Sequence, residues 1–226
     1  MMEFMLDTAN LDAVSRCVDI FPICGVTGNP SILKAEGKID FFSHLKKLRQ
    51  IIGRERSLHV QVVAGDFQGI IKEAETILRK IDDRVFIKIP VTEEGLKAAG
   101  CLHDRGVRVT ATAIYTQAQA LMAAARGADY LALYCNRMKN MDIDADLSVK
   151  TLRAVFDREG MASKILAASF KGIGQVSAAI AAGAHGVTVS PSLLHDALGL
   201  PVIQAAVNDF YRDWTAVQGD VSIADL

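Results

Sequence analysis

Eight short runs rich in β-branched and aromatic residues recur along this chain, and segments of helical periodicity separate most of them. Neighbouring parallel strands need a crossover of a dozen or more residues, usually a helix, so this alternation predicts parallel β/α units. The runs are Phe4–Thr8, Ile23–Thr27, Leu58–Val63, Val85–Val91, Val107–Ile114, Tyr130–Cys135, Lys164–Phe170 and Gly186–Ser190. Helical periodicity is found, for example, over residues 40–52, 69–80, 93–105, 116–126, 147–158 and 175–182.

The number of units predicts an α/β fold, a single-domain (β/α)₈ TIM barrel over residues 1–226, because 226 residues is close to the minimum for that barrel. Residues 201–226 are expected to add a C-terminal helix and tail. The alternative is an open doubly wound sheet. It is favoured only by Gly172-Ile-Gly-Gln-Val-Ser177, which has two glycines of a dinucleotide fingerprint but serine in place of the third.

Composition excludes several classes of partner. The net charge is -1 and the basic residues are scattered, which argues against nucleic acid and anionic membranes. Apolar runs are too short to cross a bilayer, and the N-terminus lacks the features of a secretory signal. The four cysteines form no CxxC pair or recognisable disulfide framework. We therefore expect reduced thiols and a cytoplasmic protein.

Polar residues lie at or just after the ends of seven predicted strands, where catalytic groups gather in TIM barrels. The candidates are Asp7, Thr27, Asn29, Gln61, Lys88, Thr112, Tyr134, Asn136, Arg137, Ser169 and Lys171. Several have simpler explanations. Asp7 could cap the first helix, Asn29 precedes a proline and could form a turn, Thr112 is a good strand former, and Tyr134 could be a core ring. Gln61 would be costly inside a barrel without partners.

Lys88 is the most unusual of these residues, because it interrupts the apolar stretch Arg84-Val-Phe-Ile-Lys-Ile-Pro90. Side chains alternate along a strand, so Lys88 must share a face with Phe86, while Ile87 and Ile89 face the other way. The apolar isoleucines suit the helix layer, which directs the lysine into the barrel mouth.

A lysine among apolar walls has a lowered pKa, and its neutral amine can attack a carbonyl to form a Schiff base. Asp7, Tyr134 and the Gln61/Thr112 pair are suitable groups for the accompanying proton transfers. The five histidines are dispersed without metal-ligand spacing, so no metal or other cofactor is expected. Arg137 and Ser169 could hold a phosphate, although Arg137 could equally be a solvated loop charge.

Five blocks in order resemble the small transaldolase family and extend the likeness over nearly the whole chain. They are Gly25–Ser31 (GVTGNPS), Phe86–Gly95 (FIKIPVTEEG), Thr110–Ala120 (TATAIYTQAQA), Tyr130–Arg137 (YLALYCNR) and Leu166–Lys171 (LAASFK). The resemblance implies that Lys88 is the Schiff-base lysine and Asp7 an acid/base. It also implies that Asn29, Arg137 and Ser169 contact a sugar phosphate.

Four positions separate branches of the family. Gln61 and Tyr134 are similar to fructose-6-phosphate aldolases, whereas transaldolases proper usually have glutamate and phenylalanine there. Gly28 and Leu133 depart from the usual threonine and proline, which leaves the donor preference open. The resemblance also implies a pentamer or decamer in which the C-terminal helix reaches a neighbour.

The sequence therefore predicts a class I aldolase that acts on fructose 6-phosphate or similar sugar phosphates through a dihydroxyacetone-type donor, with Thr27 among the substrate-binding residues. One alternative is a transaldolase, which transfers the dihydroxyacetone unit to a second sugar phosphate. Another is a barrel that binds sugar phosphates without turnover, for which Gly28 and Leu133 are the only indications.

Overall fold

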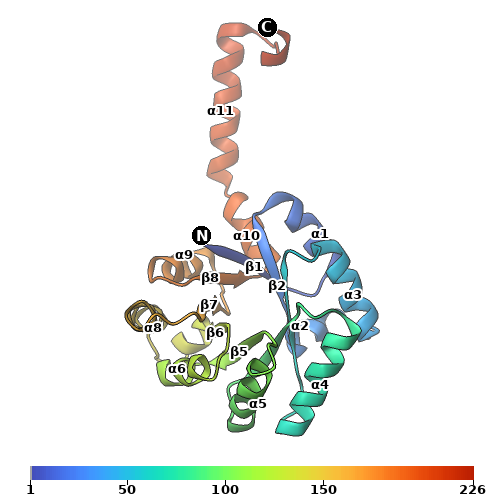
Figure 1. Ribbon diagram of the computed structural model, residues 1–226. Helices are drawn as coiled ribbons and strands as arrows, with labels where there is room; N and C mark the ends of the chain where they lie inside the picture. The colour runs from blue at the N-terminus through green and yellow to red at the C-terminus, as the bar shows by residue number, and fades with distance from the viewer. Residues whose placement is uncertain (1) are drawn as a thin grey trace.

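All eight strands pair in parallel to close a barrel in the computed structural model, which describes residues 2–226 (Figure 1). The strands follow the chain order, and β1 pairs with β8 to complete the ring. They are β1 (Glu3–Asp7), β2 (Ile23–Thr27), β3 (Ser57–Gln61), β4 (Phe86–Pro90), β5 (Val109–Ile114), β6 (Tyr130–Tyr134), β7 (Lys164–Ala168) and β8 (Gly186–Val189). The predicted (β/α)₈ barrel is confirmed.

Helices surround the strands, and capping residues mark where many of them begin. Asp66, Thr92, Thr116 and Asp144 each accept a hydrogen bond from a free amide of the first turn. The helices are α1 (Leu11–Ile20), α2 (Pro30–Ala35), α3 (Phe41–Ile52), α4 (Phe67–Lys80), α5 (Glu93–His103), α6 (Gln117–Ala125), α7 (Cys135–Lys139), α8 (Ala145–Glu159), α9 (Ile173–Ala181), α10 (Pro191–Leu198) and α11 (Pro201–Gln218), with a 3₁₀ turn at Ile223–Asp225.

Some predicted boundaries are wrong for local reasons. The fifth strand begins at Val109 rather than Val107, because the Val107 amide bonds to the Leu102 carbonyl and closes the end of α5. The sixth strand ends at Tyr134, and the next residue begins the short helix α7. Asn136 and Arg137 therefore lie on a helix rather than at the strand end.

The barrel interior contains an aromatic layer below the level of Lys88. His59 stacks on Phe86 with ring centroids 4.6 Å apart, and both rings meet Tyr130 edge-on. The His59 ring nitrogens contact the hydroxyls of Thr110 at 2.7 Å and Ser57 at 2.9 Å. Burial lowers the pKa of His59 to about 3, so this imidazole is neutral at physiological pH.

Helix α11 projects away from the barrel as an isolated rod (Figure 1). None of its residues is buried, although it carries a stripe of apolar side chains at helical spacing: Ile203, Val207, Phe210 and Trp214. The tail folds back over its end, where the Trp214 indole donates to the Val221 carbonyl at 2.9 Å.

Gly25 in β2 tests how closely the strands pack. A Cβ atom at this position would lie 2.0 Å from Ser57 Oγ and 3.0 Å from the Ser57 carbonyl oxygen, whereas a Cβ at Gly28 would meet no atom within 4 Å. We expect Gly25→Ala to lower the free energy of unfolding by about 1–3 kcal/mol through overpacking. Gly28→Ala is the matched control and should change it by less than about 0.5 kcal/mol. Urea unfolding of both variants measures the difference, and equal stabilities would contradict the prediction.

Candidate active site

Lys88 lies inside the barrel near its C-terminal end, as strand alternation predicts. The residue is 3% exposed, and its Nζ donates to the carbonyl oxygen of Gly28 at 3.1 Å. Ile87 and Ile89 pack with the helix-facing core, while Phe86 packs with an interior cluster. Burial lowers the pKa of Lys88, Asp7 opposes this shift, and Arg137 adds to it. The neutral amine is therefore more accessible than in a solvated lysine.

Asp7 ends β1 and is held by a chain of hydroxyl groups. Thr27 donates to Asp7 Oδ1 at 2.7 Å, and the hydroxyls of Thr27 and Thr188 are 2.7 Å apart. Burial raises the pKa of Asp7, against the opposing effects of Lys88 and the Thr27 hydrogen bond. In α1, the capping side chain is Asn10, so Asp7 does not cap that helix.

Thr27 is completely buried, and its hydroxyl bonds to Asp7 and Thr188. Its contact with a substrate stays a prediction. Thr188 belongs to the same chain of hydroxyls and was missed by sequence analysis. Its inward position on β8 follows from the same alternation that identified Lys88, so the signal was present in the run Gly186–Ser190.

Tyr134 and Thr112 form a second polar pair. Thr112 donates to the Tyr134 phenol oxygen at 3.1 Å, which leaves the phenolic proton free to be donated elsewhere. Burial raises the pKa of Tyr134, so the phenol stays protonated at neutral pH. Ala113, next to Thr112, has φ of 57° within a bulge of β5, where the register to β6 shifts between Ala111 and Ile114. The bulge lets Thr112 face the interior while Ile114 packs outward.

Arg137 approaches this pair from the first turns of α7. Its guanidinium lies 4.7 Å from the centre of the Tyr134 ring, and its Nη1 donates to the Tyr115 hydroxyl at 3.5 Å. The Tyr115 and Tyr134 rings meet edge-on. Tyr115 was missed by sequence analysis because it follows the end of β5, so alternation gives no direction for it. Arg137 is exposed, and its guanidinium contacts the face of the Tyr134 ring and the Tyr115 hydroxyl.

Gln61 and Lys88 occupy paired register positions on β3 and β4. Within residues 2–226, the Oε1 atom of Gln61 is buried without a hydrogen-bond partner. The residue also borders an apolar cavity of about 620 Å³ between α2, α3 and α4, lined by Leu33, Phe41 and Ile77 among others. Gln61 therefore offers an acceptor near the amine.

Asn29, Ser169 and Lys171 lie outside regular strands, next to α2 or between β7 and α9. Asn29 caps α2 through a 3.1 Å bond from the Ile32 amide, which matches the turn-forming role considered for it. Ser169 follows β7 with φ of 63°, and its carbonyl accepts from the Asn136 amide at 2.9 Å. Asn136 also accepts from Gln175, which joins α7 after β6 to α9 after β7. The predicted residues thus converge on one end of the barrel, with Asn29 and Ser169 at its rim.

Comparisons with known proteins identify the family of the chain. A family model described as transaldolase/fructose-6-phosphate aldolase matches residues 4–221. The chain belongs to this family. It is 50% identical over 222 residues, 98% of this chain and 100% of the other, to a protein of Streptococcus pneumoniae (strain ATCC 700669 / Spain 23F-1) described as a probable fructose-6-phosphate aldolase. As a member of the transaldolase/fructose-6-phosphate aldolase family, the chain is an aldolase- or transaldolase-type enzyme.

A more distant likeness concerns the fold alone. A solved structure described as "Native KDPGal structure" gives a TM-score of 0.59 at 14% identity, over 83% of this chain and 81% of that one. Among residues 2–226, no helix combines the length and apolar character needed to cross a membrane. In the same part of the chain, no three histidine, cysteine or acidic residues are grouped as metal ligands.

The Thr27–Asp7 hydrogen bond generates a prediction with a defined pH dependence. Thr27→Val leaves Asp7 and Thr188 without this partner and should lower the free energy of unfolding at pH 7 by about 1–3 kcal/mol. In the wild type, the Thr27 hydrogen bond favours ionised Asp7. Its loss in the variant should therefore raise the pKa of Asp7 further above 3.8. The part of this loss that comes from ionised Asp7 is present above the folded-state pKa of Asp7. It fades as the pH falls through that pKa toward 3.8.

Urea unfolding between pH 3.5 and 8, with a ¹³C-carboxyl titration of Asp7, measures both effects. Thr27→Ser keeps the donor and serves as the control. A Thr27→Val loss that is the same at every pH would show that packing, not the carboxylate, is responsible.

Proposed function

We propose that the protein is a class I aldolase that cleaves or forms fructose 6-phosphate or a similar sugar phosphate, with Lys88 as the Schiff-base residue. The observation that carries this is the buried Lys88 amine, whose pKa burial lowers, in the mouth of a barrel of this family. The relative named as a probable fructose-6-phosphate aldolase supports the choice of substrate.

In the cleavage direction, the Lys88 amine attacks the ketone carbon of the sugar, and loss of water gives an iminium ion. The bond between the carbons α and β to the iminium carbon then breaks. Its electron pair moves toward the iminium and forms an enamine. The hydroxyl of the departing carbon loses its proton to a base and becomes the aldehyde of a phosphorylated product. Protonation of the enamine and hydrolysis release dihydroxyacetone and restore the amine.

The polar groups of the mouth suit the proton transfers in these steps. Asp7 is the carboxylate whose charge raises the pKa of Lys88, and Thr27 and Thr188 form the chain of hydroxyls that holds it. Tyr134 keeps its proton and accepts from Thr112, which suits a donor that acts directly or through water. Gln61 supplies an acceptor to orient the same water. Arg137, Ser169 and Asn29 at the rim are proposed to contact the phosphate and hydroxyl groups of the substrate.

Trapping with borohydride tests the Schiff base. We expect dihydroxyacetone plus borohydride to add a reduced donor to Lys88, as located by peptide mass mapping. Lys88→Met should lose this adduct and reduce turnover by roughly a thousandfold or more, since no nucleophile remains. Lys72→Met, at another lysine that borders the neighbouring cavity, is the matched control and should keep both. Normal turnover without an adduct at Lys88 would refute the mechanism. Binding of the sugar phosphate with neither adduct nor turnover would indicate a non-catalytic sugar-phosphate-binding protein.

A coupled assay separates aldolase from transaldolase activity. We expect free dihydroxyacetone to be released from fructose 6-phosphate without any acceptor, because Tyr134 and Gln61 organise a water for hydrolysis of the intermediate. Tyr134→Phe removes the proton donor and should slow this release by about 10²- to 10⁴-fold. Turnover that requires erythrose 4-phosphate would instead establish the transferase.

The exposed stripe on α11 supports a proposed homo-oligomer, a pentamer or decamer by family resemblance. A helix of 18 residues extends roughly 27 Å, far enough to reach a second copy of the chain. The apolar cavity beside Gln61 is the surface that we propose receives it. Free cysteines at positions 17, 24, 101 and 135 agree with the proposed cytoplasmic location.

Single charges on α11 test this assembly. Val207 is about half exposed in one chain. We expect Val207→Asp to shift the mass measured by light scattering toward the monomer, because the charge would be buried at the contact. Asn208→Asp adds the same charge to the adjacent residue, off the stripe, and should leave the mass unchanged. Equal masses for both variants would exclude this face as the contact.

A further inference from the structure

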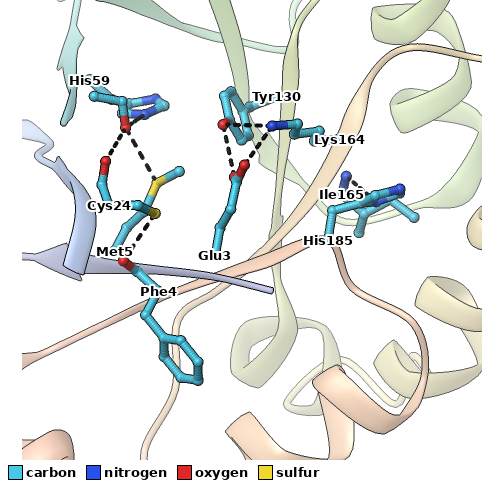
Figure 2. A network of polar contacts seen from close by, with 10 residues as sticks. Glu3, Phe4, Met5, Cys24, His59, Tyr130, Lys164, Ile165 and His185 are labelled. Carbon is cyan, nitrogen blue, oxygen red and sulfur yellow. Dashed lines mark hydrogen bonds and ion pairs between the residues drawn. The ribbon is translucent and has the colours of Figure 1, made fainter. Parts of the chain in front are cut away.

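A separate polar cluster lies at the opposite end of the barrel from the reactive end of Lys88, where the strands begin. The Glu3 carboxylate on β1 accepts from the Tyr130 hydroxyl at 2.8 Å and from Lys164 Nζ at 2.5 Å (Figure 2). Tyr130 and Lys164 are the first residues of β6 and β7. Since Lys164 offsets its charge, Glu3 contributes little net negative charge to its surroundings.

A cavity of about 250 Å³ opens beside this cluster. We call it the base pocket and define it by four arginines, Arg54, Arg56, Arg84 and Arg108, around Phe86 and Tyr130. Its size is below that of pockets for drug-sized ligands, so it suits a small molecule. All four arginines come from the segments that lead into β3, β4 and β5, which are consecutive in the barrel.

Two of these arginines have no acidic partner. Arg54 pairs with Asp83 at 2.8 Å and Arg84 with Glu55 at 3.1 Å. Within residues 2–226, neither Arg56 nor Arg108 has a carboxylate within 4.0 Å. The base pocket therefore has an excess of positive charge.

The two unpaired arginines differ in their contacts, since Arg56 is partly buried and Arg108 is exposed. Arg56 donates to the carbonyl oxygens of Ile23 at 2.9 Å and Ile52 at 3.1 Å, and the Arg108 guanidinium lies 5.5 Å from the centre of the Phe86 ring. A guanidinium fixed in this way loses less entropy when it binds an anion. Cys24 also borders the base pocket, and burial raises its pKa to about 11, so the thiol stays neutral and does not offset the charge.

Solvated arginines at a barrel base can serve solubility alone, in which case each would be mobile and independent. Here backbone carbonyls orient the Arg56 guanidinium, the exposed Arg108 guanidinium lies over the Phe86 ring, and both border one cavity. We propose that the base pocket binds a small phosphate-bearing anion, either free phosphate or a phosphate monoester, at a site separate from the catalytic mouth. Planar guanidinium groups are well matched to phosphate oxygens.

Isothermal titration of the full-length protein with inorganic phosphate tests the site. Arg137→Gln is introduced first, so that binding at the mouth does not obscure the measurement. In this background we expect one remaining phosphate site, and adding Arg108→Gln should weaken it by about tenfold or more through loss of a charge-assisted contact. Arg105→Gln removes the same charge from an exposed arginine three residues away that pairs with Glu75, and should leave affinity unchanged.

Three results would overturn the proposal: no phosphate binding in the Arg137→Gln background, unchanged affinity after Arg108→Gln, or an equal loss in the Arg105→Gln control. Glycerol 3-phosphate, titrated in the same way, identifies the ligand class. Tighter binding than inorganic phosphate indicates a monoester, and weaker binding indicates free phosphate. Arg108→Gln alone should retain wild-type aldolase turnover, which verifies that the variant is folded and that the site is distinct from the mouth.

Discussion

Burial of the Lys88 amine inside a closed ring of strands is the constraint on which the arrangement of the mouth depends. An ammonium ion removed from water is costly, and so is the Asp7 carboxylate nearby. Each charge partly offsets the cost of the other, as the opposing effects on their pKa values show. The hydroxyls of Thr27 and Thr188 add a fixed donor to the carboxylate. The mouth can therefore keep a lysine whose pKa burial lowers without losing the fold.

Local backbone distortions place the remaining polar groups. Ala113 and Ser169 both adopt positive φ although neither is glycine, and they lie at the ends of β5 and β7. Such conformations cost energy and persist only where the surroundings hold them. At Ala113 the distortion allows Thr112 to meet Tyr134 inside the barrel. A third non-glycine residue with positive φ, Asp142, lies between α7 and α8.

Strand periodicity was sufficient to predict the barrel, the inward direction of Lys88 and the gathering of polar groups at one end. It failed where the chain leaves regular structure. No glycine at Ala113 or beside it marks the bulge in the sequence. The helix that carries Arg137 is only five residues long, which is too short to show helical periodicity. Thr27 was expected at the substrate because of its place at a strand end, yet its burial depends on contacts to Asp7 and Thr188 from β1 and β8. Pairings between distant segments of this kind are not encoded in local pattern.

The neutral histidine layer in the middle of the barrel has a consequence for how such a protein can change. His59 lies between the two ends of the barrel, both of which carry charged groups. With a pKa of about 3, its imidazole is neutral at physiological pH and adds no charge between them. Its hydrogen bonds to Thr110 and Ser57 use both ring nitrogens and involve neither Lys88 nor an arginine of the base pocket. Substitutions that retune the mouth for another sugar therefore need not disturb the arginines at the base. The two ends of one barrel can diverge under separate selection.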